Sequence, residues 1–346
     1  MSLSAPTRRH ILALGLVAAL AAALPATAAE EAWVEIYSGW GSVLRPGAIY
    51  GRVHKGKPIP RPKPGESTLK KFLETLEALE LHALPHARLK VEGIPSIRGT
   101  VMADRLGFFT YRVPPRLKPG VVNVTFRLIE PVRYTARLSS INVQIWDHRP
   151  GYAVLSDIDD TLIDSGVTHK WTLIKNTLFR NTWDLKKFPF GPEAVTRLTG
   201  RIAKGMPALP LFYLSGSPWG LHERISSYFD RVYYPHGTMI LRRYSKDPLN
   251  PFDFKKPHLL EIIDSLPERR FILLGDTGEK DPEVYTAINR ERPGRIAAIY
   301  IHNVTKEDPR APRFSGMTVF KNWAEVAHDA VAKKLAYSSS AAAGSR

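Results

Sequence analysis

The sequence has 346 residues and is 44% hydrophobic, which excludes a disordered chain and allows a sizeable core, most simply in two domains. Its formal net charge of +16 favours an acidic partner, such as a phosphate ester, an anionic lipid headgroup or a nucleic acid. The basic residues are scattered, without zinc-binding cysteines or an RNA-module signature, so we expect no nucleic-acid partner.

Residues 1–28 follow the order of an export signal. Arg8 and Arg9 precede an uncharged apolar run at 11–24, and small residues then lead to an expected cleavage near Ala29. The run is short for a bilayer span, and its removal with the two arginines would leave a charge of 16 − 2 = +14. The residues around Arg8 and Arg9 are similar to a twin-arginine signal, and the chain has no cysteine. We therefore expect an exported, periplasmic protein.

Residues 29–149 contain short runs of alternating polar and apolar residues and few helical patterns. The runs read AWVEIYSG, ARLKVEGI, FFTYRV, VNVTFRLI and INVQIW, and they predict an antiparallel β-sandwich. A proline-rich loop at 57–65 precedes one amphipathic helical face at 69–76. Because no catalytic constellation appears here, we expect an accessory domain that supports the fold or binds a surface, with a hinge at 148–151.

Strand and helix patterns alternate in residues 150–337. Apolar runs of strand length occur at 152–155, 209–214, 271–274 and 296–301, and helical faces lie between most of them. This alternation predicts a parallel sheet with helices on both faces, whose ligands bind at the carboxyl ends of the strands. The remaining tail, residues 338–346, has low complexity, and we expect it to be disordered.

The stretch from Tyr152 to Gly166 reads YAVLSDIDDTLIDSG, a short apolar run followed by carboxylates. In an extended chain Asp157 and Asp159 would point to the same side, because the side-chain period of a strand is two. Two such carboxylates at the end of a buried strand are costly unless a cation or a proton lies between them. These residues alone leave three interpretations open: a catalytic pair, an acidic surface turn or a calcium loop.

Further polar residues follow at strand ends and helix starts. Ser215 ends LPLFYLSGS, Lys255 and Lys256 open a helix, and Asp276 lies in GDTGEKD after another apolar run. In this order the residues resemble the haloacid-dehalogenase superfamily of phosphatases. The segments SDIDDT, YLSGSPW, FILLGDTGEKDPEVY and AIYIHNV are similar to the catalytic domain of the actin-patch-type phosphatidate phosphatases, and the resemblance covers about residues 150–305.

The resemblance implies an α/β fold, namely a haloacid-dehalogenase-like Rossmannoid parallel sheet with a small flap insert, preceded by the β-sandwich domain. The flap corresponds to the insert at 167–190, which carries Trp171 and Trp183 among lysines and arginines. Two interpretations of this insert remain open: a flap packed on the core, or a contact in which the tryptophans enter the headgroup layer of an anionic membrane.

The resemblance also implies roles for the matched residues. Asp157 would attack phosphorus and form an aspartyl-phosphate, and Asp159 would act as the general acid and then as the general base. Asp157, the main-chain oxygen of Asp159 and Asp276 would form a hard oxygen set that suits Mg²⁺. The expected residues around the phosphate are Thr161, which would also hydrogen-bond the turn, and Ser215, Gly216, Lys255 and Lys256.

Several assignments depend on local context. We interpret Ser217 as a helix N-cap before Pro218, which leaves Ser215 as the catalytic serine. Counting back from Asp276 in the family pattern favours Lys255 over Lys256 as the catalytic lysine, although the family usually has His-Lys where this chain has Phe-Lys. For Asp281 two roles remain open: a helix cap, or a carboxylate that orients the metal-binding residues without binding the metal itself.

The expected function is Mg²⁺-dependent hydrolysis of a phosphate monoester, and the substrate implied by the resemblance is phosphatidate, which would yield diacylglycerol. One alternative is a phosphatase that acts on a soluble phosphate ester. Another is a non-catalytic protein that binds a lipid or a surface. The positive charge favours attachment to an anionic membrane surface, and the sequence does not indicate an oligomeric state.

Overall fold

The computed structural model describes residues 30–56, 82–93, 96–164, 186–200, 208–243 and 246–337. The predicted export signal, the helical face at 69–76, most of the insert at 167–190 and the tail at 338–346 lie outside these residues. Within the described ranges, every helix is too short or too polar to cross a membrane.

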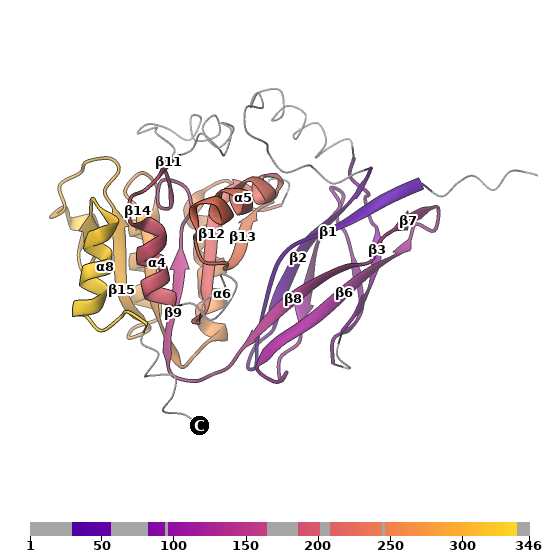
Figure 1. The fold of residues 1–346 in the computed structure, drawn as a ribbon, viewed down its shortest axis with the longest axis horizontal. Helices are drawn as coiled ribbons and strands as arrows, with labels where there is room; N and C mark the ends of the chain where they lie inside the picture. The colour runs from indigo at the N-terminus through magenta and orange to yellow at the C-terminus, as the bar shows by residue number, and fades with distance from the viewer. Residues whose placement is uncertain are drawn as a thin grey trace, which may run out of the picture.

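Eight N-terminal strands form one sheet in the order β4-β3-β6-β8-β1-β2-β5, and β7 pairs with β1 (Figure 1). The bounds are β1 Glu30–Ser42, β2 Gly47–Lys55, β3 Arg88–Glu92, β4 Arg98–Met102, β5 Phe108–Val113, β6 Gly120–Glu130, β7 Tyr134–Ala136 and β8 Ser139–Trp146. This arrangement differs from the expected antiparallel sandwich of two sheets. The long strand β1 pairs with β2 on one side, and on the other side it pairs in parallel with β7 near its start and with β8 at its end. One strand thereby joins all the others into a single mixed sheet.

The second sheet is parallel throughout and has the order β13-β12-β9-β14-β15-β16. Its strands are β9 Gly151–Ser156, β12 Leu211–Pro218, β13 Thr238–Arg242, β14 Arg269–Asp276, β15 Ile296–His302 and β16 Thr318–Phe320. The helices of this part are α4 Gly191–Thr199, α5 His222–Val232, α6 Pro251–Ser265, α7 Asp281–Glu291 and α8 Trp323–Ala332. Helix α4 packs beside α8, and α6 packs beside α7. Two short antiparallel strands, β10 Ile163–Asp164 and β11 Lys186–Lys187, pair residues just before the insert with residues near its end.

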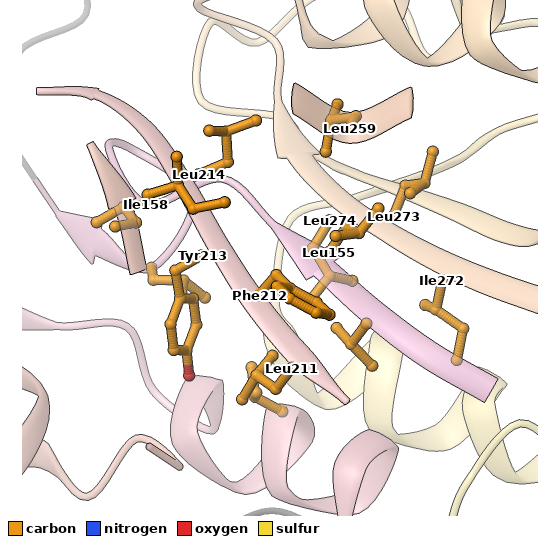
Figure 2. Close-up of a cluster of buried hydrophobic side chains, with 14 of the residues drawn as sticks. Leu155, Ile158, Leu211, Phe212, Tyr213, Leu214, Leu259, Ile272, Leu273 and Leu274 are labelled. Carbon is orange, nitrogen blue, oxygen red and sulfur yellow. The ribbon is translucent and has the colours of Figure 1, made fainter. Parts of the chain in front are cut away.

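The central strands of the parallel sheet are buried on both faces, as their continuous apolar runs require. Figure 2 shows Leu155 of β9, Phe212 of β12 and Leu273 of β14 packed together, and each is at most 2% exposed. Burying one such side chain contributes about 1.5–3 kcal/mol. Because β9, β12 and β14 are parallel neighbours, their carboxyl ends meet at one edge of the sheet, where the predicted site residues lie.

Candidate active site

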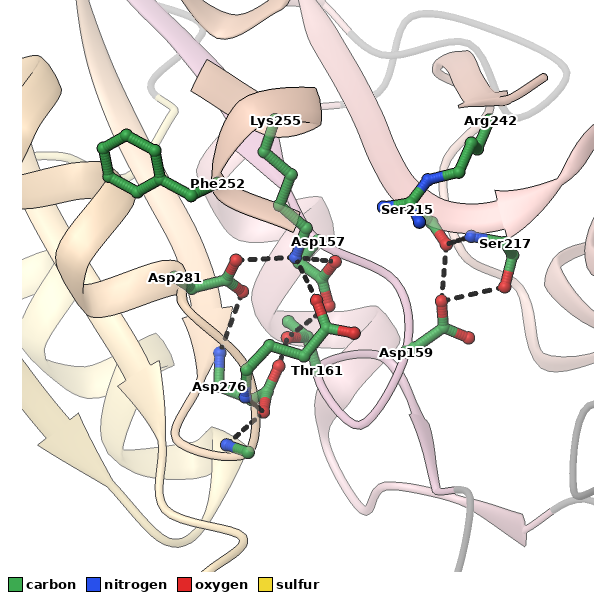
Figure 3. A network of polar contacts seen from close by, with 12 residues as sticks. Asp157, Asp159, Thr161, Ser215, Ser217, Arg242, Phe252, Lys255, Asp276 and Asp281 are labelled. Atoms are coloured by element: carbon green, nitrogen blue, oxygen red, sulfur yellow. Dashed lines mark hydrogen bonds and ion pairs between the residues drawn. The ribbon is translucent and has the colours of Figure 1, made fainter. Parts of the chain in front are cut away.

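The loop after β9 carries Asp157 and Asp159 and turns at Asp160. The strand ends at Ser156, and the N–H of Asp157 still donates to the carbonyl of Leu274 in β14 at 2.9 Å. Asp160 then adopts a left-handed conformation with a φ of 56°. Both carboxylates are buried, but their side chains reach different partners (Figure 3).

Lys255 lies at the centre of the carboxylate cluster. Its Nζ is 2.7 Å from Asp157 Oδ1, 2.6 Å from Asp281 Oδ1 and 2.9 Å from Glu279 Oε2, and the side chain is 1% exposed. Helix α6, which carries this lysine, begins with Asn250 as a side-chain cap and a proline at its first turn. Lys256 points elsewhere: its side chain is 26% exposed and pairs with Glu291 at 2.5 Å. The geometry therefore brings Lys255, and not Lys256, into the site.

Asp276 and Asp281 complete the cluster at the end of β14. Asp276 Oδ1 accepts hydrogen bonds from the N–H groups of Gly278 and Glu279 at 2.5 and 3.2 Å. The hydroxyl of Thr161 lies 3.1 Å from Asp157 Oδ2 and 3.4 Å from Asp276 Oδ2, so it joins the two strand ends.

Asp281 is the first residue of α7, and its side chain does not cap that helix. One of its oxygens accepts from Lys255, and the other accepts from the N–H of Asp276 at 3.3 Å. A Cβ at Gly275 would lie 2.6 Å from Asp281 Oδ2, so a glycine is required for this close approach. Of the two roles left open for Asp281, the contacts favour support of the cluster.

The interpretation of Ser217 as a helix cap is wrong, because its hydroxyl donates to Asp159 Oδ2 at 3.0 Å. Ser215 donates to the same oxygen at 2.5 Å and also accepts from the N–H of Ser217 at 2.8 Å. Between Leu214 and Pro218 the register of β12 against β13 shifts, so the intervening residues bulge out of the ladder. The bulge presents both serines to Asp159, with Gly216 between them. The strand then resumes at Pro218. A serine followed by a proline is typical of a helix start, which explains the wrong interpretation.

Burial is the main influence on the titration of these groups. It raises the pKa of Asp159 to about 6, although the hydrogen bonds from Ser215 and Ser217 act in the opposite direction. Burial and the neighbouring carboxylates raise the pKa of Asp157 and of Asp276 well above their ordinary values. Burial alone would lower the pKa of Lys255, but the surrounding carboxylates raise it, so this lysine is a cation at neutral pH.

The raised pKa of Asp159 predicts that the metal-free protein loses stability as the pH rises from about 4 to about 6. In that range the folded carboxyl keeps its proton while the unfolded chain, with an ordinary pKa of 3.8, releases it. A difference of about two pKa units corresponds to roughly 3 kcal/mol. Asp159→Asn should not show this loss of stability between about pH 4 and about pH 6. Urea unfolding in EDTA at about pH 4 and about pH 6 would measure the free energy of unfolding of both proteins. Asp308→Asn, at an exposed carboxylate, is the control. Parallel pH curves for wild type and Asp159→Asn would contradict the assignment.

The cluster fits a hard divalent cation such as Mg²⁺. Carboxylate oxygens of Asp157, Asp276 and Asp281 lie within 4.8 Å of one another, and all three side chains are buried. Together with Glu279, four carboxylates face the single charge of Lys255, so a bound cation would offset the remaining repulsion. The sequence predicted the main-chain oxygen of Asp159 as a ligand beside Asp157 and Asp276. The carboxylate of Asp159 does not belong to the cluster of Asp157, Asp276 and Asp281.

Three contributors were not found from the sequence. Glu279 lies within the GDTGEKD motif, but nothing in the motif indicates that it would reach Lys255. His302, at the end of β15, has Nδ1 3.0 Å from the carbonyl oxygen of Asp160, which can only accept, so this nitrogen carries the proton. Arg242, at the end of β13, is fully buried over the ring of Phe254 and lies on the serine side of the site (Figure 3).

Buried carboxylates, a lysine and two serine hydroxyls lie together at the carboxyl edge of a parallel α/β sheet, where such folds bind their ligands. Residues 152–303 match the family model described as "Phosphatidate phosphatase APP1, catalytic domain". This part of the chain is therefore similar to the catalytic domain of phosphatidate phosphatases.

Two yeast proteins are similar to part of the chain. Phosphatidate phosphatase APP1 of Saccharomyces cerevisiae is 30% identical over 156 residues, which are 44% of this chain and 26% of that protein. An uncharacterized protein of Schizosaccharomyces pombe is 27% identical over 167 residues, or 46% of this chain and 26% of its own length. The chain thus spans about a quarter of the length of these relatives. A carbohydrate acetylesterase structure from Xanthomonas citri shares 10% identity over 78% of this chain and 59% of its own, with a TM-score of 0.29.

Proposed function

We propose that this protein is a Mg²⁺-dependent phosphatase that hydrolyses a phosphate monoester through an aspartyl-phosphate on Asp157, with phosphatidate as the substrate. The observation that carries the proposal is the buried contact of Asp157 with Lys255, beside a second carboxylate, Asp159, held by two serine hydroxyls. The similarity of residues 152–303 to a phosphatidate phosphatase catalytic domain supports the choice of reaction and substrate.

In the first step a carboxylate oxygen of Asp157 forms a bond to phosphorus while the ester P–O bond breaks. The leaving alkoxide takes the proton of Asp159, whose pKa of about 6 keeps part of the population protonated near neutral pH. In the second step the ionised Asp159 takes a proton from water, the water oxygen attacks phosphorus, and inorganic phosphate leaves with Asp157 restored.

The positive charge of Lys255 offsets the repulsion between Asp157 and the phosphate dianion as they approach. Ser215 and Ser217 hold the carboxyl of Asp159 in place, and Thr161 holds Asp157. Asp157 and Asp276, with the main-chain oxygen of Asp159 and with Asp281 adjacent, would hold Mg²⁺. When bound, the ion would supply positive charge to the phosphoryl oxygens.

The choice of a lipid substrate has one further physical support. An expected mature charge of +14 attracts the protein to an anionic bilayer, with each well-placed basic group contributing about 1 kcal/mol near the surface. Export to the periplasm is part of the proposal and rests on residues 1–28. The alternative, a phosphatase for soluble esters, would use the same site residues.

The test compares phosphatidate in anionic vesicles with a soluble aryl phosphate, each with Mg²⁺ and with EDTA. EDTA should abolish hydrolysis of both substrates, and added Mg²⁺ should restore it. Rising salt should slow phosphatidate hydrolysis more than aryl phosphate hydrolysis, because a surface attraction is screened within about 10 Å at 0.1 M ionic strength. Turnover of the soluble ester without any turnover of phosphatidate would favour the alternative, and no turnover of either would refute the phosphatase proposal.

A further inference from the structure

Trp219 connects the serine bulge of the site with the N-terminal sheet. It follows Pro218 directly, begins the short helix η1 Trp219–Leu221 and is 3% exposed. The ring of Tyr37, from β1, stacks on it with centroids 5.1 Å apart and an angle of 16°. The ring of Tyr50, from β2, approaches it at 5.3 Å. Trp219, two residues after Ser217, is therefore held by two aromatic rings of the other sheet.

Tyr37 occupies a special position in its strand. The register of β1 against β2 shifts between Ile36 and Ser38, so Tyr37 is the extra residue of a β-bulge. A bulge leaves its extra residue unpaired, bends the strand and changes the direction of the side chain. Here that side chain contacts Trp219, which lies 182 positions later in the sequence.

Strand β1 also fixes the edge of the parallel sheet beside the bulge of β12. The N–H of Met239 in β13 donates to Ser38 Oγ at 2.8 Å, and Trp40 packs edge-on against Phe212 at 5.5 Å. Since β13 is an end strand of its sheet, these contacts cover an edge that would otherwise be open. The N-terminal sheet thus contacts β12 near its start, at Phe212, and its continuation just past its end, at Trp219.

The serine bulge needs such an anchor. Ser215 and Ser217 must keep their hydroxyls within hydrogen-bond distance of one oxygen of Asp159, at 2.5 and 3.0 Å. The glycine between them allows other backbone conformations, and the irregular register removes part of the support from β13. A stacked aromatic pair contributes about 0.5–1.5 kcal/mol beyond its buried area, which is enough to shift such a local equilibrium by several fold.

We propose that the N-terminal sheet positions the two serines of the bulge: Tyr37 and Tyr50 hold Trp219 and thereby keep Ser215 and Ser217 against Asp159. The tyrosines act as positioning residues and do not contact the substrate. The catalytic part of this inference rests on the proposed phosphatase function. The structural part does not depend on it.

The experiment uses the full-length protein and a soluble alkyl phosphate with Mg²⁺, because an alkoxide leaving group depends on the proton of Asp159. Tyr37→Ala should lower kcat about 10-fold with little change in KM, because misplaced catalytic groups slow the chemical step. Tyr37→Phe should keep the wild-type kcat, since the hydroxyl makes one hydrogen bond, of 3.3 Å to Glu35, and the ring keeps its stack. Tyr37→Leu keeps part of the apolar volume but cannot stack, so kcat should fall as in the alanine variant. This variant serves if Tyr37→Ala does not fold.

Tyr111→Ala is the matched control. Tyr111 also makes one hydroxyl hydrogen bond of 3.3 Å, to the carbonyl of Arg98, but it packs on Phe126 inside the N-terminal sheet. Its loss destabilises the same sheet without touching Trp219, so kcat should remain at the wild-type value. An equal fall of kcat in Tyr37→Ala and Tyr111→Ala would overturn the proposal, because both would then report only a weakened fold.

Amide hydrogen exchange of residues 211–221 gives a readout independent of activity. The N–H of Ser217 donates to Ser215 Oγ, and it should exchange faster in Tyr37→Ala than in wild type. In Tyr111→Ala its exchange rate should equal that of the wild type. If the wild-type protein hydrolyses no phosphate ester, the proposed function fails. The exchange measurement then tests by itself whether Tyr37 positions the serine bulge. Exchange of this segment that is unchanged in Tyr37→Ala would overturn the proposal even in an active enzyme.

Discussion

Asp157→Asn should reduce phosphatase activity to the floor of the assay, a loss of about 10⁴-fold or more. The amide is a poor nucleophile and a weaker metal ligand, so one substitution removes the attacking oxygen and a charged ligand together. The fold should survive. Burial and the surrounding carboxylates raise the pKa of Asp157, so neutralising it relieves repulsion, while Lys255 keeps Asp281 and Glu279 as partners. Circular dichroism would check that the fold is intact, and kcat measured on the same preparation would check the loss of activity.

Two variants of the same loop give the comparison. Asp159→Asn should lower the turnover of an alkyl phosphate by about 10² to 10⁴-fold, and that of an aryl phosphate less, because an aryl oxide leaves without a proton. Asp160→Asn is the control, since asparagine tolerates the left-handed conformation of this position, and it should keep most of the activity. Wild-type turnover in Asp157→Asn would refute the nucleophile assignment.

Lys255→Met should lower kcat by about 10²-fold or more. It should also destabilise the metal-free protein by about 3–5 kcal/mol, the usual cost of removing one partner from a buried ion pair. The three carboxylates now within 3 Å of its Nζ would face one another without a cation. Added Mg²⁺ should recover more stability in this variant than in wild type. Thermal unfolding with EDTA and with Mg²⁺ would measure this difference.

Lys256→Met is the matched control, because it makes the same substitution one residue later in α6. Its Nζ pairs with Glu291 in α7 and the side chain is 26% exposed, so the stability change should stay within about 1 kcal/mol. The kcat should stay close to wild type. If Lys256→Met were the more damaging change, Lys256 would be the catalytic lysine and the cluster around Lys255 would be only structural.

Much of the candidate site could be predicted because it depends on strand ends. Asp157, Ser215 and Asp276 each follow an apolar run of strand length, and the parallel strands β9, β12 and β14 bring such positions to one edge. The contact between Lys255 and Asp157 is consistent with the order of motifs. Local pattern and strand direction were sufficient for these residues.

Other site features depend on packing that local pattern does not contain. Ser217 before Pro218 is typical of a helix start, but the ladder with β13 continues to Pro218, so the serine belongs to a bulge. Lys255 and Lys256 are neighbours with the same side chain. Only the orientation of α6 against β12 and α7 decides which of them is buried. Glu279 reaches Lys255 because the turn before α7 folds back over Asp276.

The sequence by itself determined where strands end in carboxylates and hydroxyls, because periodicity and turn chemistry act over a few residues. It also determined that residues 150–337 alternate between strand and helix. The tertiary structure alone decided that β1 joins its neighbours in one mixed sheet, and that Tyr37 meets Trp219 across the two sheets. Such contacts join residues far apart in the chain, and their energy depends on shape and burial, which no local pattern records.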